Sequence, residues 1–334
     1  MVCSFAAGDT VYTSNGDAVL RPFSARVRNE INGDYTLTLV CPNSEKEYVQ
    51  GNRIIAVDTP SGRQAFRVVK PTFTGTKINA VCRHVSFDAL NYYVNAVGSL
   101  TSNQYITSAF ASLKSAASPS ASIFTFSSGI GGMRFFYVAK ASLQEGLEKI
   151  RELWGGEWVR DNYSMTLISG IYNDHGANIV YRRGLKEISA EYDWSNVVTV
   201  LIPVGKDDLT LSAISSQTQY ANPFRKMVQF TQDIERESYE TDAAYNSALR
   251  GDLETQANAY LAAHCVPSVN YTIRGAVDIE GIYDLGDVAH VMDERIGVDI
   301  VVRLCAYEFD ALTGRFTELQ FGDTKKKLSD LAKK

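Results

Sequence analysis

The sequence predicts an α+β fold that is predominantly antiparallel β-structure and carries one long helix. Two periodicities support this prediction. Near both ends of the chain, apolar and polar residues alternate, as in residues 35–39 and 317–321, and a period of two is typical of strands with one buried face. Between Tyr245 and Leu261 the apolar residues recur at intervals of four, which is typical of a helix.

The length and composition are typical of a globular protein that is large enough to form more than one hydrophobic core. The chain has 334 residues, of which 45% are hydrophobic and 21% charged, so two or more domains are expected. No apolar run reaches the roughly 18 residues that a membrane span needs. The first residues lack a basic region, so we expect no signal peptide. The net charge of −5 disfavours a non-specific nucleic-acid binder, which would be basic.

The cysteines are five in number and show no repeating spacing. An odd and irregular set argues against a disulfide framework. It predicts reduced, mostly buried thiols in a chain that folds in a cytosol. The five are Cys3, Cys41, Cys82, Cys265 and Cys305.

Residues 1–94 are predicted to form a first β-rich domain. Asn32-Gly33 is a strong turn signal, and the alternating residues 35–39 follow it directly. Pro42 ends that strand. Further strands are expected at residues 53–57, 64–69 and 77–85, each of which follows a turn or breaker.

Residues 95–190 are predicted to form a small inserted α/β domain. Apolar residues at intervals of three and four indicate one short helix at residues 106–113 and a second at 142–154. Ser142 and Glu145 match a capping box at the start of the second helix. Strands are expected at residues 123–126, 133–138, 157–160 and 164–168, with a loop at 115–122.

The rest of the chain is predicted to form a second β-rich domain, from residues 191–235 and 266–323. The long helix at 236–265 interrupts it, and Thr241 is the expected N-cap of that helix. Residues 324–334 form a basic tail.

The closing hairpin of this domain has the most regular pattern. Residues 298–309 are rich in β-branched and aromatic residues and contain no Pro or Gly, which favours a central strand. Leu312-Thr313-Gly314 supplies the turn, with Gly314 free to adopt a positive φ. In residues 315–321, Thr317, Leu319 and Phe321 are expected to share the apolar face.

Candidates for catalysis are weak. Cys82 and His84 would share one face of a strand, as a thiol nucleophile and its base require. Ile78 and Ala80 share that face too, so a core assignment is at least as good. His264-Cys265 falls at a helix end, where a histidine can interact with the helix dipole.

The acidic pairs are equally ordinary. Asp174-His175, Asp207-Asp208 and Asp293-Glu294 stand in turn-like contexts, where aspartate is common for backbone reasons. The spacing of the four histidines gives no metal motif, and the glycines at 129–132 lack the Lys-Ser/Thr of a phosphate loop. We therefore expect no catalytic residue, no cofactor and no metal, and hence no enzyme.

Short motifs follow one another along the chain in a recognisable order. Besides Asn32-Gly33, the C-terminal part contains Leu285-Gly286-Asp287, Ile296-Gly297, Arg303, residues 307–310, Phe321-Gly322-Asp323 and Leu328-Ser329-Asp330. In order and spacing the set resembles the prophage endopeptidase tail family, also called tail-associated lysins, whose N-terminal module is similar to the baseplate hub of contractile-tailed phages. We take as its structural signature Asn32, Gly33, Leu285, Gly286, Asp287, Gly314, Phe321, Gly322 and Asp323.

The resemblance implies two β-barrel-like hub domains with a small inserted α/β domain and a long helix. It also implies a structural tail-tip protein, a homotrimer whose ring joins the six-fold tail tube to a three-fold tip. Expected partners are a distal tail protein or tail-tube end, a tape-measure protein, and tail fibre or receptor-binding proteins, while DNA only passes through the channel. The protein would be made and folded in the bacterial host cytoplasm and would end up at the virion tail tip.

Two other functions stay open. A cell-wall hydrolase, a peptidoglycan endopeptidase at the tail tip, would need a site within these residues. In the family, lytic domains follow the hub module of longer members, and we expect none here, because the chain ends soon after Phe321-Gly322-Asp323. A carbohydrate-binding module would be favoured by a cluster of exposed aromatic side chains.

Overall fold

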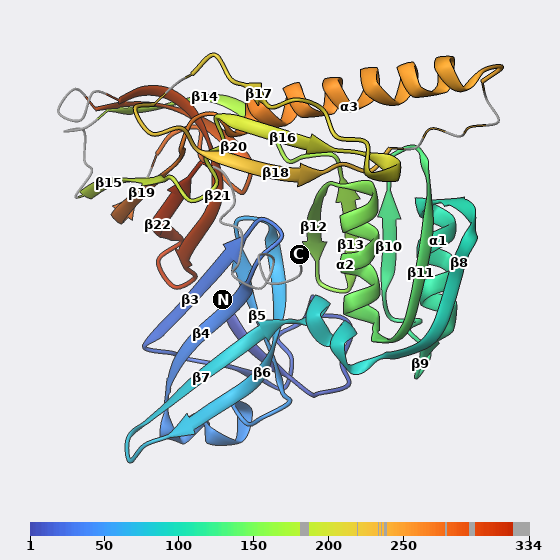
Figure 1. The fold of residues 1–334 in the computed structure, drawn as a ribbon. Helices are drawn as coiled ribbons and strands as arrows, with labels where there is room; N and C mark the ends of the chain where they lie inside the picture. Colours follow the sequence, from blue (N-terminus) through green and yellow to red (C-terminus); the bar gives the residue numbers. More distant parts are fainter. Residues whose placement is uncertain are drawn as a thin grey trace. The chain divides into compact units, whose positions relative to one another are not determined.

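The computed structural model describes residues 1–180, 187–218, 220–232, 234, 236, 239–277, 279–293 and 298–322 (Figure 1). Contacts divide the chain into two compact units, which we call unit 1 and unit 2. Unit 1 comprises Met1–Ser189 with Tyr271–Lys334, and unit 2 comprises Ala190–Asn270. The domain boundaries proposed above subdivide the chain more finely than this and stay a prediction.

Unit 1 is organised around a large, mainly antiparallel sheet. Its strands pair in the order β19-β22-β21-β3-β4-β7-β6-β5-β1-β2, and β20 pairs with both β21 and β14. No closed barrel is formed by the described strands, because β2 pairs only with β1. The strands are β1 (Val2–Phe5), β2 (Ala18–Val19), β3 (Ser24–Glu30), β4 (Tyr35–Pro42), β5 (Ile54–Thr59), β6 (Gly62–Phe73), β7 (Lys77–His84), β14 (Asn173–Val180), β19 (Ser268–Val277), β20 (Asp287–Asp293), β21 (Val298–Asp310) and β22 (Arg315–Phe321).

Strand β21 joins the two ends of the chain in this one sheet. It pairs antiparallel with β3 from Ala306↔Glu30 to Asp310↔Arg26, and on its other side with β22. The predicted turns are confirmed, since Asn32 (φ 54°) lies between β3 and β4 and Gly314 (φ 69°) between β21 and β22.

The alternation predicted for residues 315–321 holds only in part. Leu319 and Phe321 are buried, but so is Phe316, while Thr317 is half-buried. The register shifts between Glu308 and Phe309, so that Thr317 is an extra residue on its strand. Because a bulge adds one residue to the strand, the residues on one side of it point to the opposite face from the one that simple alternation predicts.

The inserted module, as we call residues 93–168, contains two three-stranded sheets, β11-β8-β9 and β10-β13-β12, with two helices (Figure 1). Its core includes Phe110, Leu113, Leu147 and Ile150, and the capping box of Ser142 and Glu145 is present as predicted. The long strand β8 was not predicted, and β9 lies within the predicted loop. The elements are β8 (Tyr93–Tyr105), α1 (Ile106–Ala116), β9 (Ala117–Ser118), β10 (Thr125–Ser128), β11 (Met133–Ser142), α2 (Leu143–Trp154), β12 (Glu157–Asp161) and β13 (Ser164–Ile168).

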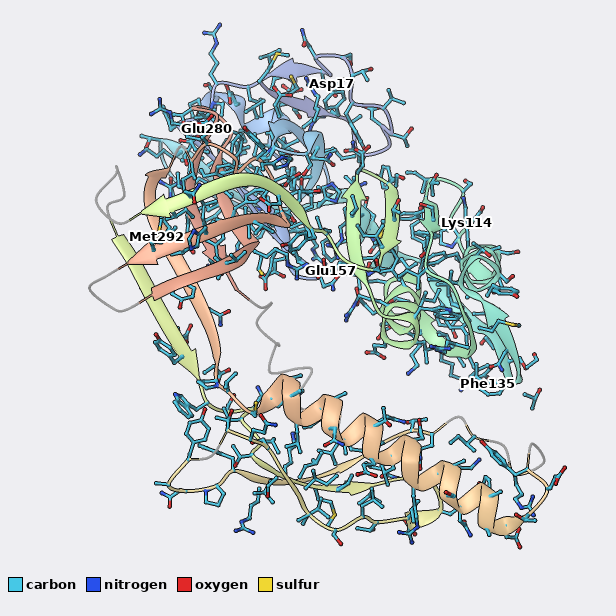
Figure 2. The ribbon with its side chains drawn as sticks, turned by 90° about the horizontal axis from the view of Figure 1, so that it is seen from above. Asp17, Lys114, Phe135, Glu157, Glu280 and Met292 are labelled. Atoms are coloured by element: carbon cyan, nitrogen blue, oxygen red, sulfur yellow. The ribbon has the colours of Figure 1, made fainter. Side chains whose placement is uncertain are left out.

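Unit 2 packs one long helix on a small sheet, and Figure 2 shows the helix along its full length. Leu261 and Ala257 of the helix pack against Val198 and Leu201. Thr241 caps the helix through a hydrogen bond from Ala244 N to its Oγ1, 3.2 Å, as predicted. The elements are β16 (Val200–Val204), η3 (Lys206–Asp208), β17 (Ile214–Ser215), β18 (Arg225–Gln229) and α3 (Asp242–His264), while β15 (Glu187–Asp193) and β19 carry the chain between the units. No helix among the described residues is long and apolar enough to cross a membrane.

Candidate functional site

The pair Cys82 and His84 belongs to the core of unit 1. Both side chains are fully buried on β7, and Cys82 packs in the same apolar cluster as Leu37 and Val68. Burial raises the pKa of the Cys82 thiol well above its ordinary value. A buried, protonated thiol is a poor nucleophile, so the core assignment is confirmed for this pair.

His84 has a defined structural role at the end of β7. Its Nδ1 accepts a hydrogen bond from Ser86 N, 3.3 Å, and lies 2.9 Å from Ser86 Oγ. The proton therefore sits on Nε2, which donates to Gln64 Oε1 at 3.0 Å. Burial and the nearby Arg160 lower the pKa of His84. No sequence pattern singled out the Ser86–His84 pair. Both side chains are fully buried, and His84 caps the short helix η2 (Val85–Asn91).

Gln64 connects this cap to the inserted module. Gln64 Oε1 also accepts from Asn162 N at 3.0 Å, and its Nε2 donates to Asp161 Oδ1 at 3.1 Å. Asn162 completes the contact, since its Oδ1 accepts from Ala65 N at 2.9 Å. The predicted β12–β13 turn is therefore seated on strand β6, and Gln64, which is buried, has both ends of its amide paired.

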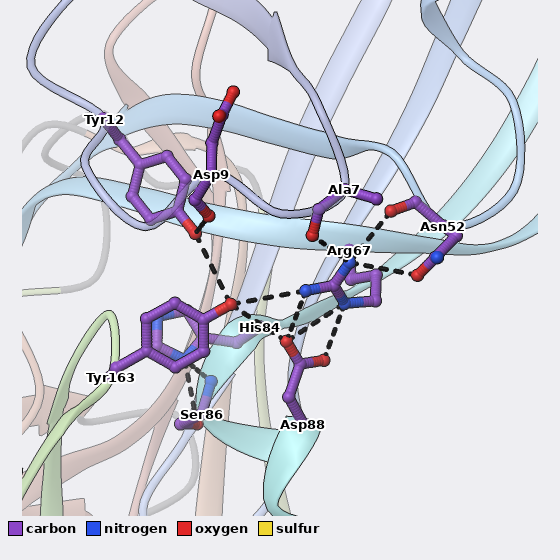
Figure 3. Close-up of polar contacts among 9 residues, drawn as sticks. All are labelled: Ala7, Asp9, Tyr12, Asn52, Arg67, His84, Ser86, Asp88 and Tyr163. Atoms are coloured by element: carbon purple, nitrogen blue, oxygen red, sulfur yellow. Dashed lines mark hydrogen bonds and ion pairs between the residues drawn. The ribbon is translucent and has the colours of Figure 1, made fainter. Parts of the chain in front are cut away.

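A second contact with the module centres on an ion pair between Arg67 and Asp88 (Figure 3). Arg67 Nε and Nη2 donate to the two Asp88 oxygens at 2.8 and 2.7 Å, and Tyr163 OH donates to Asp88 Oδ2 at 3.0 Å. Arg67 Nη1 reaches the main-chain oxygens of Ala7 and Asn52 at 3.1 and 2.9 Å. The Arg67–Asp88 ion pair is bidentate and largely buried. Such a pair has a defined geometry, and it therefore holds η2 and the Tyr163 ring in place.

The signature residue Asn32 forms a third contact. Its Nδ2 donates to Gly156 O at 3.1 Å, and its Oδ1 accepts from Trp158 N at 2.9 Å. The side-chain amide thus pairs with the main chain at the start of β12 as a neighbouring strand would. Gly33 follows with a negative φ, and a Cβ there would lie 2.6 Å from Glu30 Cδ.

A fourth contact joins β12 to the C-terminal strands. Arg303 Nη2 and Nη1 donate to the two Glu157 oxygens at 2.9 and 3.0 Å. Ile171 is held from both sides, because its N donates to Glu157 Oε2 at 2.7 Å and its O accepts from Arg303 Nη1 at 3.0 Å. Together these four contacts form what we call the module junction, centred on Asn32, Gln64, Arg67 and Arg303.

The signature Leu285-Gly286-Asp287 is a turn that packs beside Ile171. Gly286 has φ 84°, and a Cβ there would lie 2.3 Å from Ile171 Cγ2 and 2.6 Å from Ile171 O. Asp287 is 1% exposed and accepts from Tyr283 N and Asp284 N at 2.6 and 2.9 Å. The glycine allows close approach and the aspartate closes the turn.

The remaining signature residues close the hairpin. Phe321 is buried, and Gly322 N donates to Arg303 O at 2.9 Å. Gly314 N donates to Asp310 O at 2.9 Å. The motif residues Asp323, Ile296-Gly297 and Leu328-Ser329-Asp330, the basic tail and Glu294 lie outside the described residues.

The turn-like context expected for the acidic pairs holds only for Asp207-Asp208, because Asp174-His175 lies at a bulge in strand β14 and Asp293 ends strand β20. Asp174 Oδ1 accepts from Gly176 N at 2.9 Å. Asp207 and Asp208 both have positive φ, 55° and 57°, within η3. His264 Nδ1 lies 2.8 Å from Tyr260 O at the end of α3. Within the described part of the chain, no group of three or more His, Cys, Asp or Glu residues is arranged to hold a metal ion.

Three solved structures that share this fold are tail proteins. Over 99% of this chain and 97% of the other, the fold matches prophage tail protein gp18 from Listeria monocytogenes EGD-e, with a TM-score of 0.66 and 12% identity. The 43 kDa tail protein of prophage MuSo2 from Shewanella oneidensis matches over 96% and 97%, with a TM-score of 0.62 and 12% identity. A tail protein from Neisseria meningitidis MC58 matches over 96% of both chains, with a TM-score of 0.60 and 13% identity. The chain therefore has the fold of prophage tail proteins.

The family resemblance is confirmed for the C-terminal part of the chain. A model of the prophage endopeptidase tail family matches residues 173–332, nearly half of the sequence. The matched range contains Arg303 and the Leu285-Gly286-Asp287 turn. A comparison with curated protein sequences found no match.

Proposed function

We propose that this protein is a structural component of a phage or prophage tail tip, a baseplate hub. The observation that carries the proposal is the fold shared with prophage tail proteins along almost the whole chain, together with the family match over residues 173–332. The module junction supports such a role, because four separate polar contacts hold the inserted module on the large sheet of unit 1.

The hub is a homotrimeric ring around a channel, and it joins the six-fold tail tube to a three-fold tip. A ring requires a head-to-tail interface that closes. The proposed partners are a distal tail protein or tail-tube end, a tape-measure protein, and tail fibre or receptor-binding proteins, with DNA only passing through. The protein is made in the bacterial host cytoplasm and acts in the virion tail.

The experiment is assembly in the presence of the tail-tube-end partner, followed by electron microscopy. We expect a ring that contains three copies of this chain. A monomer in the absence of the partner is compatible with the proposal, since hub proteins can assemble weakly alone. A stable two-fold dimer that buries the sheet edges contradicts it.

A further inference from the structure

The tripeptide Asn-Gly-Asp occurs twice in the sequence, at residues 15–17 and 32–34. An asparagine followed by glycine is open to a reaction with the main chain. The reason is that glycine has no side chain to shield its nitrogen and leaves the backbone free to turn. No other asparagine of the 334 residues precedes a glycine. The two sites therefore have the same local chemistry, and their surroundings in the fold distinguish them.

The reaction is deamidation, and water is its co-reactant. The main-chain nitrogen of the glycine loses its proton to solvent and attacks Cγ of the asparagine, so that an N–Cγ bond forms and the Cγ–Nδ2 bond breaks. The departing Nδ2 takes up a proton and leaves as ammonia, and a succinimide ring remains. Water then opens the ring at one or the other carbonyl, which gives aspartate or isoaspartate. The net change converts an amide and a water into a carboxyl group and ammonia.

Asn32 is held away from this reaction by the module junction. Both ends of its amide are bonded, Nδ2 to Gly156 O at 3.1 Å and Oδ1 to Trp158 N at 2.9 Å. The attacking nitrogen is bonded too, because Gly33 N donates to Glu30 O at 3.0 Å, and Gly33 is buried. Closing the ring would break all three hydrogen bonds, and each broken bond adds to the barrier.

Asn15 lies in an open loop between β1 and β2. Asn15 and Gly16 are both exposed, and the Asn15 amide forms no hydrogen bond with another described residue. Gly16 N donates to Ser14 Oγ at 3.2 Å. This bond is longer than that of Gly33, and its acceptor is an exposed hydroxyl that rotates. Water therefore reaches the amide, the attacking nitrogen and the ring that they form.

The two residues after Asn15 are anchored to β1. Asp17 N donates to Ser4 O at 2.8 Å, and the Asp17 carboxylate forms an ion pair with Arg53. Gly16 has φ 64°, and a Cβ there would lie 2.3 Å from Ser4 O. Figure 2 labels Asp17. A longer main chain at residue 15 would therefore disturb the contact with Ser4 directly.

We propose that Asn15 is a modification site, which deamidates spontaneously in the folded protein to aspartate and isoaspartate, and that the docked inserted module protects Asn32 from the same change. The isoaspartate product adds one carbon atom to the main chain just before the contact with Ser4. Strand β2 pairs with β1 at two positions and with no other described strand. Loss of this short pairing leaves the β1 edge of the large sheet open to strands of other chains.

The test is peptide mapping by mass spectrometry after the folded protein has been incubated in heavy-oxygen water at mildly alkaline pH. Each deamidation introduces one heavy oxygen atom from solvent, so modification during the incubation is distinguished from earlier damage. Electron-transfer fragmentation separates aspartate from isoaspartate. We expect the Asn15 peptide to take up label about tenfold faster or more than the Asn32 peptide, because three hydrogen bonds must break at Asn32.

Unfolding is the matched control. In guanidinium chloride the two Asn-Gly-Asp sites lose their surroundings and should take up label at similar rates. Asn15→Gln should abolish labelling of its peptide in the folded protein, because the longer side chain would have to close a larger ring.

Hydrogen exchange measures the effect on β2. Asp17 N and Leu20 N donate to the β1 oxygens of Ser4 and Val2, at 2.8 and 2.9 Å. Both amides should exchange faster in the isoaspartate fraction than in unmodified protein. Equal exchange would mean that the loop absorbs the added atom, and it would overturn the proposed opening of the sheet edge.

Two results would overturn the modification site itself. If Asn15 stays unlabelled in the folded protein but reacts in guanidinium chloride, the loop protects it. If Asn15 and Asn32 take up label equally in the folded protein, the module junction gives no protection. Neither result bears on the hub function, which ring assembly tests.

Discussion

Arg303 and Glu157 form a two-pronged ion pair that ties the C-terminal strands to the inserted module across 146 positions of sequence. Their side chains are only 24% and 14% exposed. We expect Arg303→Met to lower the free energy of unfolding by about 2 kcal/mol or more, because it leaves the Glu157 carboxylate buried without a counter-charge. Urea unfolding measures the change.

The control for this prediction is the ion pair between Arg26 and Glu308, whose side chains are 54% and 31% exposed. Arg26→Met should cost less than about 1 kcal/mol, because solvent screens an exposed pair. Equal losses for the two variants would show that the Arg303 contact has no special weight in the junction.

Gly286 should tolerate no side chain. Its φ of 84° and the 2.6 Å from an added Cβ to Ile171 O leave no room for one. We expect Gly286→Ala to destabilise the protein by about 3 kcal/mol or more, through overpacking in addition to left-handed strain. Gly62→Ala is the matched control, since Gly62 has φ 91° with nothing within 4 Å. It should show only the strain, roughly 1–2 kcal/mol. Similar melting temperatures for the two would refute the close approach.

Leu319 lies on the buried face of β22 with no accessible surface. Leu319→Asp places an unpaired charge there and should cost several kcal/mol, about 3 or more. Leu312→Asp, in the β21–β22 turn, changes a side chain that is 44% exposed and should leave the melting temperature nearly unchanged. A soluble Leu319→Asp variant that melts like the wild type would mean that the face is wrongly assigned.

The buried His84 should make stability depend on pH. Burial lowers its pKa in the folded state, so the unfolded chain binds the proton more readily. The stability is therefore fully present above the ordinary histidine pKa of about 6.5 and is lost as the pH falls below it, by up to about 1.4 kcal/mol per pH unit. Urea unfolding at several pH values between 7.5 and 5 should show a steeper loss for the wild type than for His84→Gln. Parallel curves would contradict the prediction, and His175→Gln, which replaces an exposed histidine, serves as the control.

Hydrolysis of peptidoglycan is not expected, because Cys82 and His84 are closed off in the core. Purified protein incubated with peptidoglycan should cause no clearing. Clearing that disappears in a folded Cys82→Ala or His84→Ala variant would establish the hydrolase instead.

Local signals were sufficient for much of the fold. The capping box at Ser142, the N-cap at Thr241 and the turn at Gly314 each rest on a preference of a few adjacent residues, and each is present. Strand β8 was missed because Gly98 interrupts it and residues 99–104 are almost all polar, so the usual alternation of apolar and polar residues is absent. The bulge at Thr317 was missed because register depends on the partner strand.

The module junction was less accessible to sequence reasoning. Asn32 and Arg303 entered only as parts of a family resemblance, and Gln64 and Arg67 drew no attention. Gln64 and its partner Asp161 are 97 positions apart in the sequence, and Asn32 and its partner Trp158 are 126 positions apart. A polar residue whose partner is that distant has no local pattern, and only the folded chain reveals its role.

The pairing of β3 with β21 also determines when this protein can fold. Asn29 and Tyr307 meet across 278 positions, so the sheet stays incomplete until β21 has been synthesised. Contacts between such distant segments slow folding. In the meantime β3 is an open edge that can recruit strands from other nascent chains. The yield of native protein should therefore respond to the rate at which the residues between β3 and β21 are synthesised and to chaperones that shield β3.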